Sequence, residues 1–315
     1  ALGWYQALIE ARVPFEMVHD GLLDAEHLAA FRTLVLPNIA ALSDAQCGQL
    51  RQFVARGGGL VATYETSLYD EAGVKRKDFG LADLFGASYA GSGEGPMHNA
   101  YLRLEHKAAP GHPLLAGLED APRIIHGVWR LNVTPRKTLP VVPLTLIPSY
   151  PDLPMEKVYA REPRTDIAQV YLRERAADGA GRVAYFPWDL DRTYWEVLAV
   201  DHYKLLRNAV AWATNEPAPV TVEGPGVVEV TLWRQKQSVT VHLVNLTNPM
   251  MMKGPVRDLI PVGPQRVRVR LPDGLAPRAV RLLVADTTPA VTRDGQWLEL
   301  TVPSILAHEV VAIDT

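Results

Sequence analysis

The sequence predicts an α/β domain with a parallel, flavodoxin-like sheet, followed by a small all-β antiparallel sandwich. Helical and strand-like segments alternate over residues 1–90, which is the order of a parallel sheet with crossover helices. Beyond Pro219 the helical period disappears, and short alternating strands are separated by Gly- and Pro-containing turns. Between these regions stands the run Asn215-Glu216-Pro217-Ala218-Pro219, which indicates a linker. The predicted domains are therefore residues 1–216 and 217–315.

The first elements are an amphipathic helix, a short strand and a second helix. The opening helix is predicted from apolar residues at helical spacing, namely Leu2, Tyr5, Ile9 and Val13. Residues 15–19 are predicted as a strand. Asp24 is a typical N-cap residue, and we expect it to begin a helix that runs to Phe31.

Two continuous apolar runs, at residues 33–37 and 60–64, are typical of strands buried on both faces. Ser43 or Asp44 is expected to cap the helix between them. The apolar stripe of that helix is Cys47, Leu50 and Val54, and Gly57-Gly58-Gly59 ends it. Together these elements predict a parallel sheet with right-handed connections.

The predicted sheet lacks its first strand. Doubly wound folds begin with a strand that becomes central in the sheet, whereas this sequence begins at the helix that should follow it, without an initiator Met. We therefore expect a piece of a longer polypeptide, with an open slot in the sheet or a strand supplied from elsewhere. Loss of Met before the small residue Ala1 is the alternative.

The remaining elements follow from the same patterns. In the first domain, strands are expected at 101–105, 123–133, 167–172 and 182–186, and a helix at 201–212. In the second domain, strands are expected at 227–233, 238–245, 265–271, 279–284 and 297–302, with turns at 272–274 and 293–295.

Composition excludes several classes of protein. The 315 residues are 48% hydrophobic and 21% charged, as in an ordinary globular protein and unlike a disordered chain. With 32 basic and 35 acidic residues, the net charge of −3 gives no reason to expect nucleic acid or an anionic membrane as partner. A single cysteine excludes an intrachain disulfide and a multi-cysteine zinc site. No signal peptide is recognisable, and the expected location is cytoplasmic.

Nucleophilic, metal and cofactor chemistry are all weakly supported. Cys47 lies on the apolar stripe of a helix and is interpreted as a packing residue. Thr66 or Ser67, on the turn after residues 60–64, could be a nucleophile, but there is no G-x-S-x-G motif and no paired base. The histidines at 98, 106 and 112 do not have a known metal-ligand spacing. The run Gly57-Gly58-Gly59 precedes its strand, so it cannot hold a phosphate at a helix N-terminus. We expect no metal and no cofactor.

Two polar clusters, residues 64–71 and 187–195, each follow a buried strand at its carboxyl end, where open α/β sheets place ligands. Carboxylates, an arginine and aromatic rings suit a carbohydrate; the alternative is that they are structural pairs, caps and core residues. We expect the two clusters to lie close together. The candidate sugar-binding or interface residues are Glu65, Thr66, Ser67, Asp70, Trp188, Asp189, Asp191, Arg192 and Trp195.

Four segments together resemble a known family. They are LVLPNIAALSDAQCGQLRQFVARGGGLVATYETSLYDE, GHPLLAGL, GRVAYFPWDLDRTYWE and VHLVNLTNPMMMKGPVRDLIPVG. They resemble the region downstream of the catalytic barrel in family 42-like beta-galactosidases, namely the beta-galactosidase trimerisation domain and a C-terminal β-domain.

The resemblance implies a flavodoxin-like first domain of the class I glutamine-amidotransferase type that has lost its nucleophilic Cys, in agreement with Glu65-Thr66-Ser67 at the turn. It also places the catalytic carboxylates on a barrel. A barrel needs eight βα units, and this sequence has at most four.

These observations predict a non-catalytic ancillary or oligomerisation region of a beta-galactosidase-like glycoside hydrolase involved in carbohydrate metabolism. The expected partners are an upstream catalytic barrel, further copies of the chain, or both, with a carbohydrate as a possible ligand. The alternatives are a carbohydrate-binding module and a free-standing glycosidase that uses Glu65, Asp189 and Asp191. Met250, Met251 and Met252 are predicted to form a contact loop; the alternative is that they cap their own sandwich.

Overall fold

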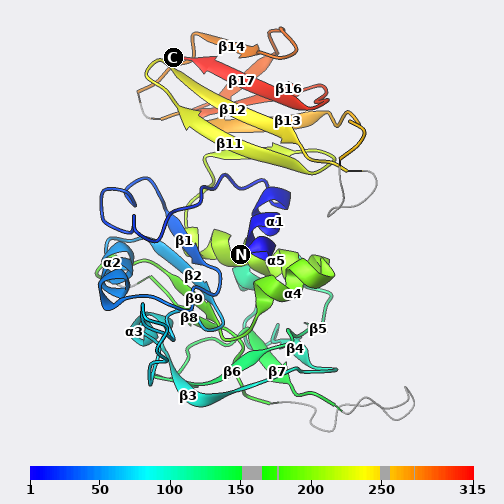
Figure 1. Cartoon of the computed structure of the whole chain (residues 1–315). Helices are drawn as coiled ribbons and strands as arrows, with labels where there is room; N and C mark the ends of the chain where they lie inside the picture. The colour runs from blue at the N-terminus through cyan, green and yellow to red at the C-terminus, as the bar shows by residue number, and fades with distance from the viewer. Residues whose placement is uncertain (151–164, 176, 249–255, 273) are drawn as a thin grey trace, which may run out of the picture. The chain divides into compact units, whose positions relative to one another are not determined.

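The computed structural model describes residues 1–150, 165–175, 177–248, 256–272 and 274–315 (Figure 1). The chain divides into two compact units. The α/β unit comprises Ala1–Trp4 and Val18–Glu216, and the β unit comprises Tyr5–Met17 and Pro217–Thr315. The division after Glu216 falls within the predicted linker. Residues 5–17, however, belong to the β unit, so helix α1 (Leu2–Glu10) contributes residues to both units.

The central sheet of the α/β unit has four strands in the order β1-β2-β9-β8. Strands β1 (Thr33–Leu36), β2 (Gly59–Thr63) and β9 (Val183–Phe186) are parallel, and β8 (Tyr171–Arg173) is antiparallel to β9. Every residue of β2 and β9 is buried, as expected of strands covered on both faces. The helices of this unit are α2 (Asp44–Ala55), α3 (Ala82–Phe85), α4 (Leu190–Val197) and α5 (Val200–Thr214).

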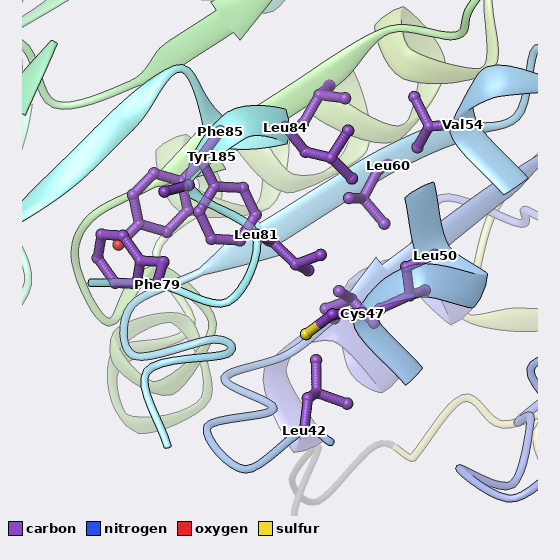
Figure 2. Close-up of a cluster of buried hydrophobic side chains, with 14 of the residues drawn as sticks. Leu42, Cys47, Leu50, Val54, Leu60, Phe79, Leu81, Leu84, Phe85 and Tyr185 are labelled. Atoms are coloured by element: carbon purple, nitrogen blue, oxygen red, sulfur yellow. The ribbon is translucent and has the colours of Figure 1, made fainter. Parts of the chain in front are cut away.

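Helix α2 begins and packs as its sequence predicts. Ser43 Oγ accepts a hydrogen bond from Gln46 N, and the Gln46 side chain accepts one from Ser43 N, which completes a capping box. Cys47 is buried in the core cluster with Leu42 and Leu50 (Figure 2). Burial also raises the pKa of its thiol. Cys47 therefore fills space in the core.

Two small antiparallel sheets complete the α/β unit. One pairs β3 (Ala87–Glu94) with β6 (Arg130–Pro135). The other has the order β5-β4-β7, formed by Arg123–Ile125, Tyr101–Leu104 and Leu144–Ile147. A 3-10 turn, η1, spans Pro113–Leu115.

The β unit contains two antiparallel four-stranded sheets (Figure 1). The first has the order β10-β13-β16-β15, formed by Val220–Glu223, Gln265–Arg270, Trp297–Val302 and Val291–Asp294. The second has the order β11-β12-β17-β14, formed by Val228–Arg234, Ser238–Asn245, His308–Asp314 and Ala279–Leu282. Buried and more exposed residues alternate along β10 and β13, and the buried valines join a single apolar cluster. This confirms the predicted antiparallel β region.

Arg12 fastens the N-terminal segment of the β unit to the turn between β10 and β11. Its guanidinium donates hydrogen bonds to the carbonyl oxygens of Val222, Gly224, Pro225 and Gly226 and to Gln265 Oε1, at 2.7–3.2 Å. Arg12 itself has φ 56°, in the left-handed region that non-glycine residues rarely adopt. Arg12 therefore ties the segment to this turn and to Gln265 through five hydrogen bonds.

Several sequence predictions were wrong. Residues 15–19 form no strand, because no segment of the described chain pairs with them and a lone strand has no partner for its backbone groups. Residues 24–31 form consecutive turns, in which Asp24 Oδ1 accepts hydrogen bonds from Glu26 N and His27 N. Strand β1 pairs directly with β2, so no slot separates them.

Other elements were misplaced or missed. Residues 123–133 divide into β5 and the start of β6. Seven elements were not predicted from the sequence: α3, α4, β3, β7, β10, β15 and β17. No helix in the described ranges is long and apolar enough to cross a bilayer.

Candidate functional site

A polar pocket of about 400 Å³ lies at the carboxyl ends of the parallel strands. Residues that follow β1, β2 and β9 reach it, and the start of α4 lies beside it. Its lining residues are Ala1, Pro37, Asn38, Tyr64, Asp189, Asp191 and Arg192. The two predicted clusters therefore meet at the carboxyl edge of the sheet.

A chain of hydrogen bonds joins the three strand ends at this pocket. Asn38 N donates to Thr63 Oγ1 at 3.0 Å, and Thr63 Oγ1 donates to Asp191 Oδ1 at 2.9 Å. Asn38 Oδ1 accepts a hydrogen bond from Glu65 N at 3.1 Å. The second oxygen of Asp191, Oδ2, lies 3.2 Å from Ala1 N.

Asp189 is a buried carboxyl group of the site, and its two oxygens have different surroundings. Its side chain is buried, and Oδ1 accepts hydrogen bonds from Trp129 N at 3.1 Å and from Thr193 Oγ1 at 3.4 Å. Its Oδ2 is buried without a hydrogen-bond partner in the described part of the chain. Burial raises the pKa of Asp189 to about 6, even though the donors at Oδ1 favour the charged form. Asp189 therefore changes charge close to neutral pH.

The loop before β6 is shaped to hold Asp189. A Cβ atom on Gly127 would lie 2.1 Å from Asp189 Oδ1 and 2.8 Å from the Trp188 ring. Only a residue without a side chain allows the backbone to approach so closely. Gly127 thereby places the Trp129 amide within reach of the carboxylate.

Tyr64 and Arg192 add hydrogen-bond donors to a pocket that also holds the carboxylate acceptors Asp189 and Asp191. Burial, followed by the nearby Glu65 and Asp189 carboxylates, raises the pKa of Tyr64 to about 12, so its hydroxyl keeps its proton. Arg192 is exposed and bonds Glu196 at 2.9 Å. Together with Asn38, these groups can donate to and accept from a polyhydroxy molecule or a polar protein segment.

Three predicted site residues serve the interior instead. Trp188 is fully buried, and its Nε1 donates to Gln169 O at 3.0 Å. Thr66 Oγ1 donates to Thr63 O at 2.7 Å, and Ser67 Oγ accepts from Leu81 N at 3.1 Å, with both side chains buried. These three candidate sugar-binding or interface residues are buried and do not line the pocket.

The other candidates lie outside the pocket lining. Asp70 Oδ1 accepts from Ala72 N and Val74 N and so closes a turn. Glu65 is partly buried, and its Oε1 accepts a hydrogen bond from Tyr69 at 3.3 Å. Trp195 is partly exposed on α4. The three-methionine segment at 250–252 lies outside the described residues.

The described residues hold no group of three or more His, Cys, Asp or Glu side chains arranged to bind a metal. His112 instead caps η1, with its Nδ1 accepting from Leu114 N. His106 Nε2 lies 3.0 Å from Ala121 O. Each of these two rings has a local structural role.

Sequence reasoning missed Pro37 and Asn38 at the pocket and Thr63 and Gly127 beneath it. The first two follow β1 directly, so the rule that ligands lie beyond carboxyl strand ends could have found them. Gly127 lies between β5 and β6, in a part of the sequence that carries no such signal.

Comparison with known proteins gives one family and several similar folds. Residues 1–89 match the family model of the beta-galactosidase trimerisation domain. Among curated proteins, none matches the chain. Alpha-L-fucosidase isoenzyme 2 from Paenibacillus thiaminolyticus is similar with a TM-score of 0.73 and 16% identity, over 99% of this chain and 44% of that one.

Two beta-galactosidases have the same fold at lower scores. The enzyme from Bacillus circulans sp. alkalophilus has a TM-score of 0.64 and 13% identity, over 99% of this chain and 36% of that one. A GH42 beta-galactosidase from G. stearothermophilus, solved as a catalytic mutant, has a TM-score of 0.59 and 14% identity, over 100% of this chain and 36% of that one. The chain thus spans less than half the length of each of these three proteins. Its residues 1–89 match the beta-galactosidase trimerisation domain, an ancillary region of a glycoside hydrolase.

Proposed function

We propose that this chain is the non-catalytic assembly region of a beta-galactosidase-like glycoside hydrolase involved in carbohydrate metabolism. The observation that carries the proposal is the match of residues 1–89 to the trimerisation domain. In this proposal the α/β unit is a flavodoxin-like, class I amidotransferase-like domain, and the chain holds copies of itself together and attaches to a catalytic barrel. A cytoplasmic location is part of the same proposal.

The geometry of the carboxylates supports a non-catalytic role. A glycosidase needs two carboxyl groups that reach opposite sides of one sugar bond. Asp189 and Asp191 are only 4% and 3% exposed, and Asp191 Oδ1 accepts a hydrogen bond from Thr63. Both carboxylates are therefore poorly accessible to a bound sugar. This argues against the alternative of a free-standing glycosidase.

The test measures both self-association and glycoside hydrolysis by the 315-residue chain. Sedimentation velocity across a range of micromolar concentrations should show self-association into trimers. Aryl galactosides and aryl fucosides should not be hydrolysed. Monomers at every concentration would contradict the assembly role, and hydrolysis that is lost in Asp189→Asn or Asp191→Asn would establish the glycosidase instead.

The methionine segment supplies a variant for the assembly arm. Replacing Met250, Met251 and Met252 with Ser should shift sedimentation toward smaller species and leave the melting temperature nearly unchanged. The matched control replaces the exposed Met17 with Ser and should assemble normally. A large fall in melting temperature with unchanged assembly would identify the three methionines as core residues.

A second candidate role is carbohydrate binding at the pocket of Asn38, Tyr64 and Arg192. The observation that favours it is the convergence of amide, phenol and guanidinium groups on one hollow of about 400 Å³. Calorimetric titration with galactose, fucose and their oligosaccharides should show binding that Tyr64→Phe weakens. Absence of heat with every sugar would leave assembly as the only role.

A further inference from the structure

A second pocket, of about 360 Å³, lies at the amino ends of β1 and β2, on the opposite edge of the sheet from Asp189. Three arginines line it, Arg32, Arg56 and Arg175, together with a single carboxylate, Glu216. All four belong to the α/β unit. Positively charged side chains therefore cluster at the amino edge of the sheet, although the net charge of the whole chain is −3.

Only one of the three arginines is neutralised. Arg32 Nε bonds Glu216 Oε1 at 2.8 Å. Arg56 and Arg175 have no ion pair and no side-chain hydrogen bond among the described residues, and both side chains are exposed. The pocket thus carries two uncompensated positive charges.

Helices α2 and α5 end at this pocket, and cations commonly stabilise helix C-termini. Here several of the last carbonyls already have other donors. Gly58 N donates to Phe53 O at 3.1 Å, and Gly57 N and Gly181 N donate to Val54 O at 2.9 and 2.8 Å. Arg182 Nη1 donates to Trp212 O at 3.1 Å. Neither Arg56 nor Arg175 donates a hydrogen bond to a helix carbonyl among the described residues.

The rest of the lining suits a molecule larger than a bare ion. Phe31 and Phe53 provide an apolar wall, and Asn215 brings an amide at the C-cap of α5. Guanidinium groups present paired N–H donors that match the oxygens of a phosphate or sulfate group. We propose that this amino-edge pocket binds the phosphate or sulfate group of a small anionic molecule, such as a sugar ester, through Arg56 and Arg175.

Calorimetric titration of the whole chain at low ionic strength tests the proposal, with inorganic phosphate, inorganic sulfate and glucose 6-phosphate as separate probes. We expect binding that weakens as NaCl is added, because exposed charges are screened. The variant Arg56→Gln/Arg175→Gln should weaken it roughly tenfold or more. The control Arg51→Gln/Arg136→Gln removes the same charge from the same unit, where both arginines pair with exposed aspartates, and should bind as the unmodified chain does.

Each outcome decides a part of the proposal. No binding of any probe, or equal binding by the Arg56/Arg175 variant and the unmodified chain, overturns the site. Tighter binding of glucose 6-phosphate than of inorganic phosphate supports an ester as ligand, and equal binding overturns that part. Circular dichroism of both variants should match that of the unmodified chain, since all four arginines are at least partly exposed.

Discussion

The two edges of the central sheet carry opposite charges in opposite physical settings. At the carboxyl edge, Asp189 and Asp191 are almost fully buried and are held by backbone and hydroxyl donors. At the amino edge, Arg56 and Arg175 are exposed and hold no partner among the described residues. Burial shifts the pKa of a charged group, so its contribution to stability changes with pH. The interactions of an exposed charge are instead screened by salt. Changes at the acidic pair are therefore expected to alter the free energy of unfolding, and changes at the basic pair are expected to alter it little.

The largest effect should come from Gly127→Ala at the carboxyl edge. The new Cβ would overlap Asp189 Oδ1 and the Trp188 ring, so the loop must shift, at an expected cost of about 3 kcal/mol of unfolding free energy. Unfolding in guanidinium chloride, followed by far-UV circular dichroism, measures the change in the free energy of unfolding. The control is Gly48→Ala in α2, where a Cβ meets nothing within 4 Å and helix propensity predicts a small gain. Equal stability of both variants would refute the packing argument.

Asp189→Asn should remove a pH dependence of stability. The pKa of Asp189 is about 6 in the folded protein and 3.8 is its ordinary value, so the folded state binds this proton more tightly than the unfolded state. The free energy of unfolding should therefore fall as pH rises from about 4 to about 6, by on the order of 2 kcal/mol.

The Asp189→Asn variant should lack this slope, so its stability relative to the unmodified chain should improve as pH rises through the same window. Chemical denaturation at a series of pH values is the measurement. An identical pH dependence in both proteins would mean that Asp189 titrates normally.

Thr63→Val should have an intermediate effect. The substitution keeps the shape but removes the hydroxyl that accepts from Asn38 N and donates to Asp191 Oδ1. Leaving these two groups without that partner should cost about 1.5 kcal/mol. Thr221→Val, on an exposed position of β10, is the control and should be nearly neutral. A neutral Thr63→Val would show that water replaces the hydroxyl at both partners.

The smallest effect is expected at the amino edge. Arg56→Gln/Arg175→Gln should change the free energy of unfolding by less than about 0.5 kcal/mol, because exposed groups without partners contribute little to stability. Denaturation in low and high salt would test this. A loss above 2 kcal/mol would place both arginines among the residues that stabilise the α/β unit.

Sequence patterns found the elements whose signals are local. The N-cap of α2, the apolar runs of β1 and β2 and the alternation in β12 are all contained in short windows. Residues 15–19 have the composition of a strand, but a strand also needs a neighbour, and composition does not supply one. Strand β15, whose residues are all exposed, has no buried stripe to reveal it.

The sequence predicted the position of the pocket better than it predicted which residues line the pocket. Asp189, Asp191 and Arg192 line the pocket, as the rule of carboxyl strand ends predicts. Trp188, Thr66 and Ser67 are neighbours in sequence but point into the core, because side-chain direction after a strand depends on the turn that follows. Tyr64 and Ser67 both have left-handed backbones, with φ of 52° and 64°, which residue type alone does not announce.

The Arg12 side chain has a consequence for the order in which the chain matures. Its partners lie 210 or more positions further along the sequence, so a ribosome releases this segment long before its binding turn exists. The segment must wait while the α/β unit is synthesised, and contacts between such distant positions form slowly. We therefore expect the β unit to close around the segment 5–17 only late in biosynthesis.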